Sequence, residues 1–199
     1  SPHQAQCRSA TVSLCRPGGT GPQADITIGQ VFHNKKRPMT DNLHAQHTAI
    51  LREVLASAHH NRHLQKGRPF AAAIADDAGS ILGRGVNTIS QTQDMTGHAE
   101  MEAIRDCCHQ RQLPHLQGLT VYASGHPCPM CLAAIVAGQA KQVFFAFDNA
   151  DAAPYGLSSE GVYQRLGLQL QPPPLPIQRL DLGISAAQLY GDAPWPSAG

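Results

Sequence analysis

The segments HAE (residues 98–100) and PCPMC (residues 127–131) decide the fold and the chemistry that this sequence predicts. Each opens a stretch with helical character, residues 98–110 and 127–138, and the apolar run 119–123 between them is typical of a short strand. Cys128 and Cys131 are three residues apart, so a first helical turn places both thiols on one side, where they can bind one ion. The pattern therefore predicts a metal site at the beginnings of two helices.

The side chains of His98, Cys128 and Cys131 offer one imidazole and two thiolates, which are ligands that zinc prefers. Three protein ligands leave the fourth tetrahedral position open, as catalytic zinc sites require. The positive ends of both helices also favour thiolate over thiol. We therefore predict one Zn²⁺ per chain, bound by these three residues.

Glu100 lies two residues after His98, about 200° around a helix, so the two side chains are poorly placed to bind one ion together. A carboxylate beside an open metal position can instead take a proton from water and deliver it to a ring nitrogen and a departing amine. We therefore expect Glu100 to be the catalytic acid and base.

Other uses of the two thiols remain as alternatives. A closed structural site needs a fourth ligand, but Cys107 and Cys108 lie about 14 Å along the helix from His98, which leaves His126 as an outside candidate. A redox pair would leave the histidine and the carboxylate without a role. A zinc-stabilised binding module without catalysis would have no use for Glu100.

The chain has 199 residues, 42% of them hydrophobic and 15% charged, as expected for one globular domain with tails. Residues 1–38 mix Gly, Pro, Ser and Gln without apolar periodicity, and we expect a mobile tail. Residues 39–170 form the predicted catalytic domain. Residues 171–199 begin with a proline-rich stretch and are expected to pack on the core as an arm.

Helices and strands alternate along the predicted domain, which favours an α/β fold with parallel strands covered by helices. Apolar spacing predicts a first helix from Leu43 to near Asn61, and its histidines lie around several sides, as on a solvated face rather than a second metal site. Those histidines are His44, His47, His59, His60 and His63. The further expected elements are a hairpin of 69–75 and 80–86, a strand at 142–147, a helix at 158–166 and a short helix at 184–190. Residues 171–174 break the chain before the segment 177–180, to which we assign no element.

The charge balance is nearly neutral, with 15 basic and 14 acidic residues, so no broad footprint for a polyanion is present. No run approaches the roughly 18 to 20 apolar residues of a membrane span, and we expect no membrane partner. The first thirty residues lack the apolar segment of a secretory signal, and the six cysteines are unevenly spaced. We therefore expect a cytoplasmic protein without a disulfide framework.

The combination of His-x-Glu and Pro-Cys-x-x-Cys resembles the signature of zinc nucleobase deaminases of the cytidine deaminase-like superfamily. Residues 123–135 look most like bacterial guanine deaminases and tRNA adenosine deaminases, and the resemblance covers roughly residues 43 to 165. It implies a three-layer α/β/α sandwich with a mixed, roughly five-stranded sheet. It also implies hydrolytic release of ammonia and a homodimer.

The same resemblance implies roles for residues that bind the substrate. Asn87 matches an asparagine that hydrogen-bonds the purine, the backbone N–H of Ala99 matches a contact to the base, and Phe70 matches a position near the base. Tyr190 matches an aromatic residue that reaches a neighbouring subunit's pocket. By position alone, Asn87 can also be read as a turn residue after the strand. Phe70 is more often a core residue on periodicity alone, and a tyrosine in a terminal helix usually only packs.

The expected substrate is a small purine base, or a related aminated heterocycle or nucleoside, and the expected activity is guanine deaminase-like. The alternative is adenosine deamination in tRNA, which needs a flipped single-stranded base and a basic surface. The chain departs from the family at His126, where a glutamate is usual, and at residues 157–160 (LSSE), where guanine deaminases carry acidic residues. These departures are expected to affect the choice of substrate.

Overall fold

The structure is a computed structural model that describes residues 41–64 and 67–196. The tail expected over residues 1–38 lies outside the described residues. In chain order the elements are α1 (Asp41–His63), β1 (Ala71–Ala75), β2 (Ile81–Val86), α2 (Ile89–Thr92), α3 (Ala99–Arg111), β3 (Thr120–Gly125), α4 (Pro129–Ala137), β4 (Gln142–Phe147), α5 (Asn149–Ala152), η2 (Ala153–Tyr155), α6 (Glu160–Arg165), β5 (Ile177–Arg179) and α7 (Ala186–Leu189).

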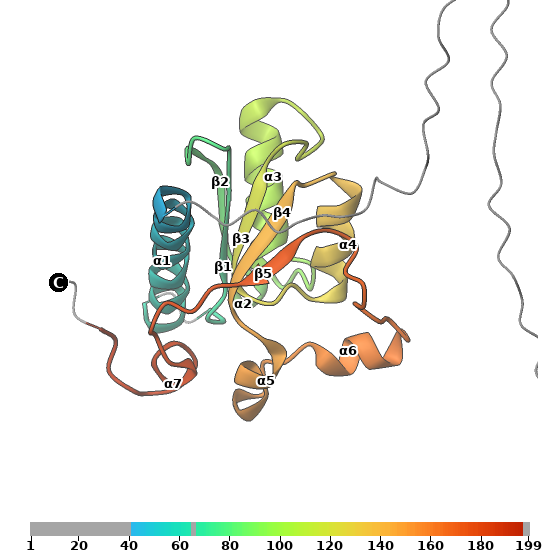
Figure 1. Ribbon diagram of the computed structural model, residues 1–199. Helices are drawn as coiled ribbons and strands as arrows, with labels where there is room; N and C mark the ends of the chain where they lie inside the picture. The colour runs from blue at the N-terminus through green and yellow to red at the C-terminus, as the bar shows by residue number, and fades with distance from the viewer. Residues whose placement is uncertain (1–40, 65–66, 197–199) are drawn as a thin grey trace, which may run out of the picture. The chain divides into compact units, whose positions relative to one another are not determined.

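The strands form one mixed sheet in the order β2-β1-β3-β4-β5 (Figure 1). Strand β1 is antiparallel to β2 and β3, whereas β3, β4 and β5 are parallel to one another. The expected hairpin of β1 and β2 is present, and its turn is closed by Asp76, whose carboxylate accepts hydrogen bonds from the backbone of Ala78 and Ser80. The five-stranded mixed sheet that the family resemblance implied is confirmed.

Helices cover both faces of this sheet (Figure 1). Ala71, Ala73 and Ala75 of β1 belong to the core that contains α1, while Ala72 and Ile74 belong to the core that contains α3 and α4. This alternation follows from the period of two along a strand, and it places every side chain of β1 in one core or the other. The predicted three-layer α/β/α architecture is therefore confirmed.

Two glycines let α3 lie directly against β2. A Cβ atom at Gly85 would lie 2.3 Å from the backbone nitrogen of Ala103 and the backbone oxygen of Ala99, and one at Gly83 would lie 2.6 Å from the oxygen of Ala103. Only glycine fits such distances without movement of the helix backbone. The close contact fixes the beginning of α3 at the edge of the sheet.

The residues after β5 return to α1. Leu180, Leu182 and Leu189 are buried in the same core as α1. Arg52 of α1 donates a 2.9 Å hydrogen bond to the carbonyl of Leu182. None of the helices within the described ranges is long and apolar enough to cross a membrane.

The structure departs from the sequence expectation in two respects. Helix α2 and the α5–η2 segment were not expected, because helices of four and three residues show no full period of apolar spacing. The prediction of a solvated histidine face is wrong for His47, which is only 4% exposed. Its Nδ1 atom lies 2.6 Å from the Tyr122 hydroxyl, because the position faces the sheet on the apolar side of α1.

Candidate active site

The candidate site lies at the edge of the sheet where β3 and β4 end and where α3 and α4 begin. His98 is the N-cap of α3 and Cys128 is the N-cap of α4, each with extended backbone. Pro129 stands in the first turn of α4, where its fixed φ angle suits a helix start and its missing N–H costs nothing. Both helices therefore direct their positive ends at the same place.

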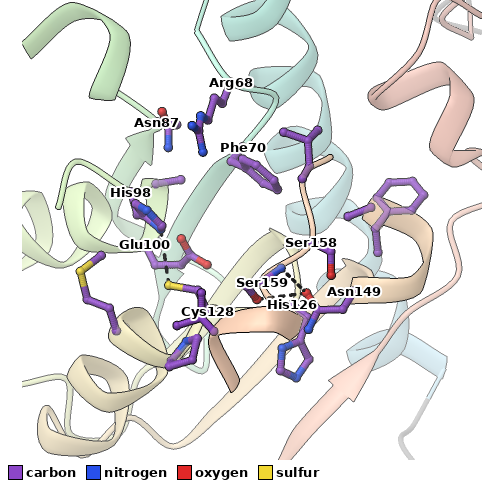
Figure 2. A pocket seen from close by; sticks show the side chains of 18 of the residues that line it. Arg68, Phe70, Asn87, His98, Glu100, His126, Cys128, Asn149, Ser158 and Ser159 are labelled. Atoms are coloured by element: carbon purple, nitrogen blue, oxygen red, sulfur yellow. Dashed lines mark hydrogen bonds between the residues drawn. The ribbon is translucent and has the colours of Figure 1, made fainter. Parts of the chain in front are cut away.

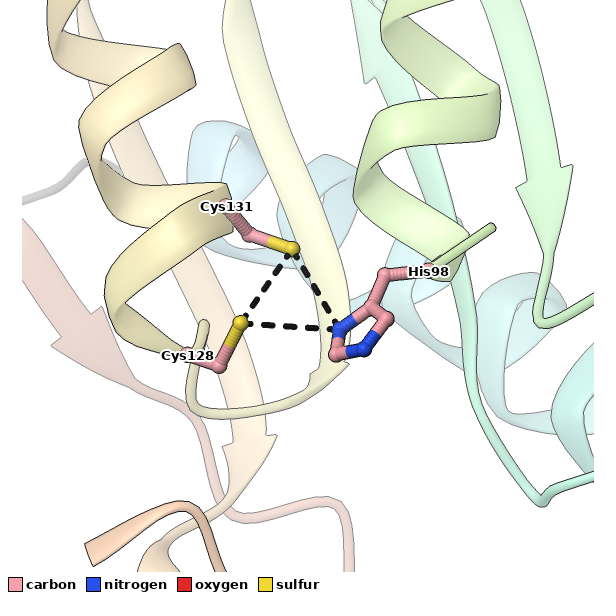
Figure 3. A group of neighbouring side chains, drawn as sticks. All are labelled: His98, Cys128 and Cys131. Atoms are coloured by element: carbon pink, nitrogen blue, oxygen red, sulfur yellow. Dashed lines mark hydrogen bonds between the residues drawn. The ribbon is translucent and has the colours of Figure 1, made fainter. Parts of the chain in front are cut away.

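The side chains of His98, Cys128 and Cys131 converge there (Figure 3). The Nδ1 atom of His98 lies 3.5 Å from the Cys128 sulfur and 3.7 Å from the Cys131 sulfur, and the two sulfurs are 3.6 Å apart. A tetrahedral zinc ion with bonds of about 2.3 Å to sulfur and about 2.0 Å to nitrogen requires a separation of about 3.5 Å between nitrogen and sulfur and about 3.8 Å between the two sulfurs. The group therefore fits zinc as it stands.

No fourth protein ligand joins this group among the residues that the structure describes. Cys107 is buried in the core between the sheet and α3. His126, the outside candidate, turns its Nδ1 atom to the carbonyl of Pro127 at 3.0 Å. Within the described residues the arrangement therefore offers three candidate ligands, as catalytic zinc sites have, and not the four of a closed structural set.

The two cysteines differ in acidity when no metal is bound between them. The hydrogen bond between their sulfurs lowers the pKa of Cys128 to about 4, and the contact with His98 contributes further. The same bond, together with burial, raises the pKa of Cys131. A divalent cation bound here would favour the thiolate form of both residues.

Glu100 lies in the first turn of α3 and is 8% exposed. Figure 2 shows its carboxylate in the cavity beside His98 and Cys128. Burial raises the pKa of this carboxyl group, because the charged form loses its hydration. A carboxyl group whose pKa is shifted toward neutrality can both accept and return a proton.

The cavity above these residues has a volume of about 370 Å³, within the range of small-molecule sites. Every residue for which the sequence suggested a role in substrate binding lines it: Phe70, Asn87, Ala99 and Tyr190. The remaining apolar lining comes mainly from Met95, Met130, Phe147, Leu157 and Val162. A planar aromatic ring would fit between such walls.

Asn87 is 2% exposed and directly follows β2. Its side-chain oxygen accepts a 3.3 Å hydrogen bond from the backbone nitrogen of Ile89, and its own backbone nitrogen donates to the carbonyl of Phe70 at 3.0 Å. In Figure 2 the side-chain nitrogen of Asn87 lies on the side of the amide toward His98. Within the described residues this nitrogen has no hydrogen-bond acceptor, and Asn87 lines the cavity. It is therefore available as a donor to a bound ring.

Tyr190 lines the cavity of its own chain, a position that differs from the expected alternatives of a neighbour's pocket and of simple packing in a terminal helix. Its ring lies 5.9 Å from that of Phe70 and 5.3 Å from that of Phe147, measured between centroids. Its buried hydroxyl has no hydrogen-bond partner within the described part of the chain. Tyr190 thus completes the aromatic wall from the arm.

Sequence reasoning missed the residues that support the loop before Cys128. Tyr163 of α6 donates a 2.7 Å hydrogen bond to the carbonyl of Pro127, which His126 also contacts. A carbonyl only accepts, so the Nδ1 atom of His126 must carry the proton. His126 therefore helps to hold the Cys128 loop. The apolar spacing in 158–166 predicted the helix but could not identify this contact.

The cavity rim formed by residues 148–159 is also held by internal contacts. Asp148 caps α5, accepting a 2.9 Å hydrogen bond from the nitrogen of Asp151, and it pairs with Arg179 at 3.0 Å. The side-chain oxygen of Asn149 accepts from both the nitrogen and the hydroxyl of Ser159. The carboxylate of Asp148 at this rim is therefore already paired with Arg179.

Residues 44–147 match the family described as the cytidine and deoxycytidylate deaminase zinc-binding region. The chain belongs to this deaminase family. The guanine deaminase of Bacillus subtilis is 32% identical to this deaminase over 136 residues, which cover 68% of this chain and 86% of that enzyme. Its X-ray structure covers the same shares of the two chains and matches with a TM-score of 0.59.

Two further relatives widen the comparison. A tRNA-specific adenosine deaminase of Aquifex aeolicus is 33% identical over 85 residues, covering 43% of this chain and 56% of that one. The structure of a guanine deaminase from Nitrosomonas europaea, at 20% identity, shares the fold with a TM-score of 0.61 over 72% of this chain and 81% of that one. This deaminase is thus a hydrolytic enzyme that acts on carbon–nitrogen bonds, and its matched range contains His98, Cys128 and Cys131.

Proposed function

We propose that this deaminase releases ammonia from a small purine base, or from a closely related aminated heterocycle or nucleoside, with one zinc ion per chain. The observation that carries the proposal is the buried carboxylate of Glu100 beside a three-ligand metal group in an aromatic-walled cavity. The similarity to the Bacillus subtilis guanine deaminase supports a purine as the substrate class.

In this proposal His98, Cys128 and Cys131 bind the zinc ion. When bound there, zinc supplies Lewis-acid activation of the attacking water. The separations of the three ligand atoms and the presence of one such group within the described residues support one ion per chain.

Glu100 moves the protons. It accepts the proton that the attacking water gives up when its oxygen bonds to the amine-bearing ring carbon, and it passes that proton to the adjacent ring nitrogen. It then carries the remaining proton of the attacking oxygen to the amino group, so that the carbon–nitrogen bond breaks and ammonia leaves. One carboxylate can serve both transfers because both atoms lie on the same edge of the substrate.

Other residues orient the ring. The free side-chain nitrogen of Asn87 donates a hydrogen bond to an acceptor on the base. Ala99 is the first residue of α3, so its backbone N–H has no partner in a preceding helical turn and is available as a second donor. Phe70 and Tyr190 provide apolar surface for the ring.

The alternative substrate, adenosine in tRNA, is supported by the similarity to tRNA-specific adenosine deaminases. A polyanion gains its affinity mainly from basic side chains, and the formal net charge of this chain is only +1. We therefore rank a small substrate first.

Compartment and assembly are also part of the proposal. The four cysteines within the described residues are free thiols, which supports a reducing compartment such as the cytoplasm. The family resemblance supports a homodimer. Size-exclusion chromatography with light scattering would measure its mass, and a monomer at assay concentration would contradict this part.

The function is tested by ammonia release from guanine, adenine, cytosine, their nucleosides and a tRNA anticodon stem. We expect the zinc-loaded protein to turn over at least one free base or nucleoside, and to turn over the RNA more slowly. Chelation of the metal should abolish the activity and added zinc should restore it. Turnover of the RNA alone would favour the alternative, and turnover of none would contradict the proposal.

A further inference from the structure

Asn61 lies in the last turn of α1, outside the cavity, and is 1% exposed. Its side-chain nitrogen donates two hydrogen bonds, one to the carbonyl of Arg68 at 2.8 Å and one to the carbonyl of Asn87 at 3.0 Å. Arg68 and Asn87 both line the cavity. A single buried amide thus connects two segments of the cavity wall to the first helix.

The chain is built closely around this amide. The backbone nitrogen of Gly67 donates to the carbonyl of Asn61 at 2.9 Å, and a Cβ atom at Gly67 would lie 2.5 Å from the Asn61 side-chain nitrogen. The side-chain oxygen of Asn61 has no hydrogen-bond partner within the described ranges. The two carbonyl contacts of the side-chain nitrogen therefore determine how the amide is turned.

We propose that Asn61 is a positioning residue for the deamination, which acts by fixing the backbone of Asn87. The inference rests on the proposed function, in which the free donor of Asn87 binds the base. Asn87 is held by its nitrogen to Phe70, by its side-chain oxygen to Ile89 and by its carbonyl to Asn61. The contact to Asn61 is the one that ties this turn to α1.

The physical reason is that a small displacement matters at a reacting site. Without the amide, the carbonyl of Arg68 keeps the backbone nitrogen of Phe70 as a donor at 2.8 Å. The carbonyl of Asn87 has no second donor within the described residues, so the backbone at Asn87 must turn to find one. A shift of about 1 Å in a group that orients substrate can lower the rate about 100-fold. The effect should pass through Asn87, because its side chain is the one that contacts the base.

The test is a double-mutant cycle in the zinc-loaded chain of 199 residues, with Asn61→Leu, Asn87→Ala and the double variant. Leucine has a similar volume and no donor. We expect Asn87→Ala to lower kcat/KM about 5- to 150-fold on the best substrate of the panel. Asn61→Leu should lower it at least about 5-fold in the wild-type background and less than about 2-fold in the Asn87→Ala background.

A matched control separates this role from loss of stability. Thr120→Val removes the hydroxyl of a residue that is 2% exposed, against 1% for Asn61, and this hydroxyl accepts a 3.2 Å hydrogen bond from Gln142. Thr120 is the first residue of β3 and does not line the cavity. This substitution should lower Tm and leave kcat/KM unchanged. If Asn61→Leu does not fold, Gly67→Ala, whose Cβ presses on the Asn61 amide, takes its place in the cycle.

Equal losses from Asn61→Leu in both backgrounds, or a lower Tm with unchanged kcat/KM, would overturn the proposal. Wild-type protein that turns over no substrate would instead count against the proposed function. The position of Asn87 in a crystal structure of Asn61→Leu would then decide the inference by itself. An undisplaced Asn87 would refute it, and a displaced one would support it.

Discussion

Replacing Glu100 with glutamine tests the proposed chemistry most directly. Glutamine has the same shape, and the side chain is only 8% exposed, so the walls around it should keep it in place. The amide cannot take a proton from water or return one to the substrate. Loss of a general acid–base typically costs about 10² to 10⁴ in rate. Because Glu100 is proposed to serve two transfers, we expect a loss of at least about 10⁴-fold in kcat, or about 5.4 kcal/mol of transition-state stabilisation.

The assay is steady-state ammonia release, with bound zinc measured by plasma mass spectrometry and substrate affinity by calorimetry. Zinc content and affinity should stay near those of the wild type, because the metal ligands and Asn87 are unchanged. Glu102→Gln is the matched control, since Glu102 is on the same helical turn but pairs with Arg105 at 2.8 Å and does not line the cavity. A Glu100→Gln protein that keeps its zinc and more than about a tenth of the wild-type rate would refute the proton-transfer role.

Three further outcomes are expected. Cys131→Ser should reduce bound zinc well below one ion per chain and abolish activity, and plasma mass spectrometry showing full zinc would contradict its role as a ligand. Gly85→Ala places a methyl group 2.3 Å from the backbone of α3, so calorimetry should show a Tm lower by at least about 3 °C, whereas Gly161→Ala, with open space around it, should leave Tm unchanged or raise it. Burial lowers the pKa of His47, so the stability it contributes is present above about pH 6.5 and lost as the pH falls below that value. Denaturant unfolding at about pH 7 and about pH 5 should therefore show a smaller loss of stability in His47→Gln than in the wild type, and an equal loss would contradict the assignment.

Much of the fold could be predicted, because the spacing of residues along short segments determines the helix starts and the hairpin. The thiol spacing of Cys128 and Cys131 fixes their geometry once a helix begins at residue 129, and the hairpin follows from its turn residues. His98 could be paired with them because all three stand at the starts of elements that return to one edge of the sheet. The grouping of His98, Cys128 and Cys131 could therefore be predicted from the sequence alone.

Contacts between distant residues could not be predicted in the same way. The pairing of Asp148 with Arg179 depends on the position of β5 beside β4, which no local pattern specifies. Tyr190 follows a proline-rich stretch whose path the sequence leaves open. Asn61, by contrast, could have been found from the sequence, because it continues the spacing of the buried positions Val54 and Ala58 on α1. A polar residue at a buried position needs hydrogen-bond partners there.

The cavity has an inner part on the helices next to the sheet and an outer rim on peripheral segments. The proposed chemistry depends on the inner part, whereas the rim can vary. The metal group and Glu100 stand on helices packed against the strands, whereas the outer rim of the cavity comes from residues 148–159 and from the arm that carries Tyr190. Changes in these peripheral segments would alter which ring fits without disturbing the proton transfer that we propose for Glu100. The same scaffold could therefore acquire new substrates in evolution, or in the laboratory, by exchange of its rim alone.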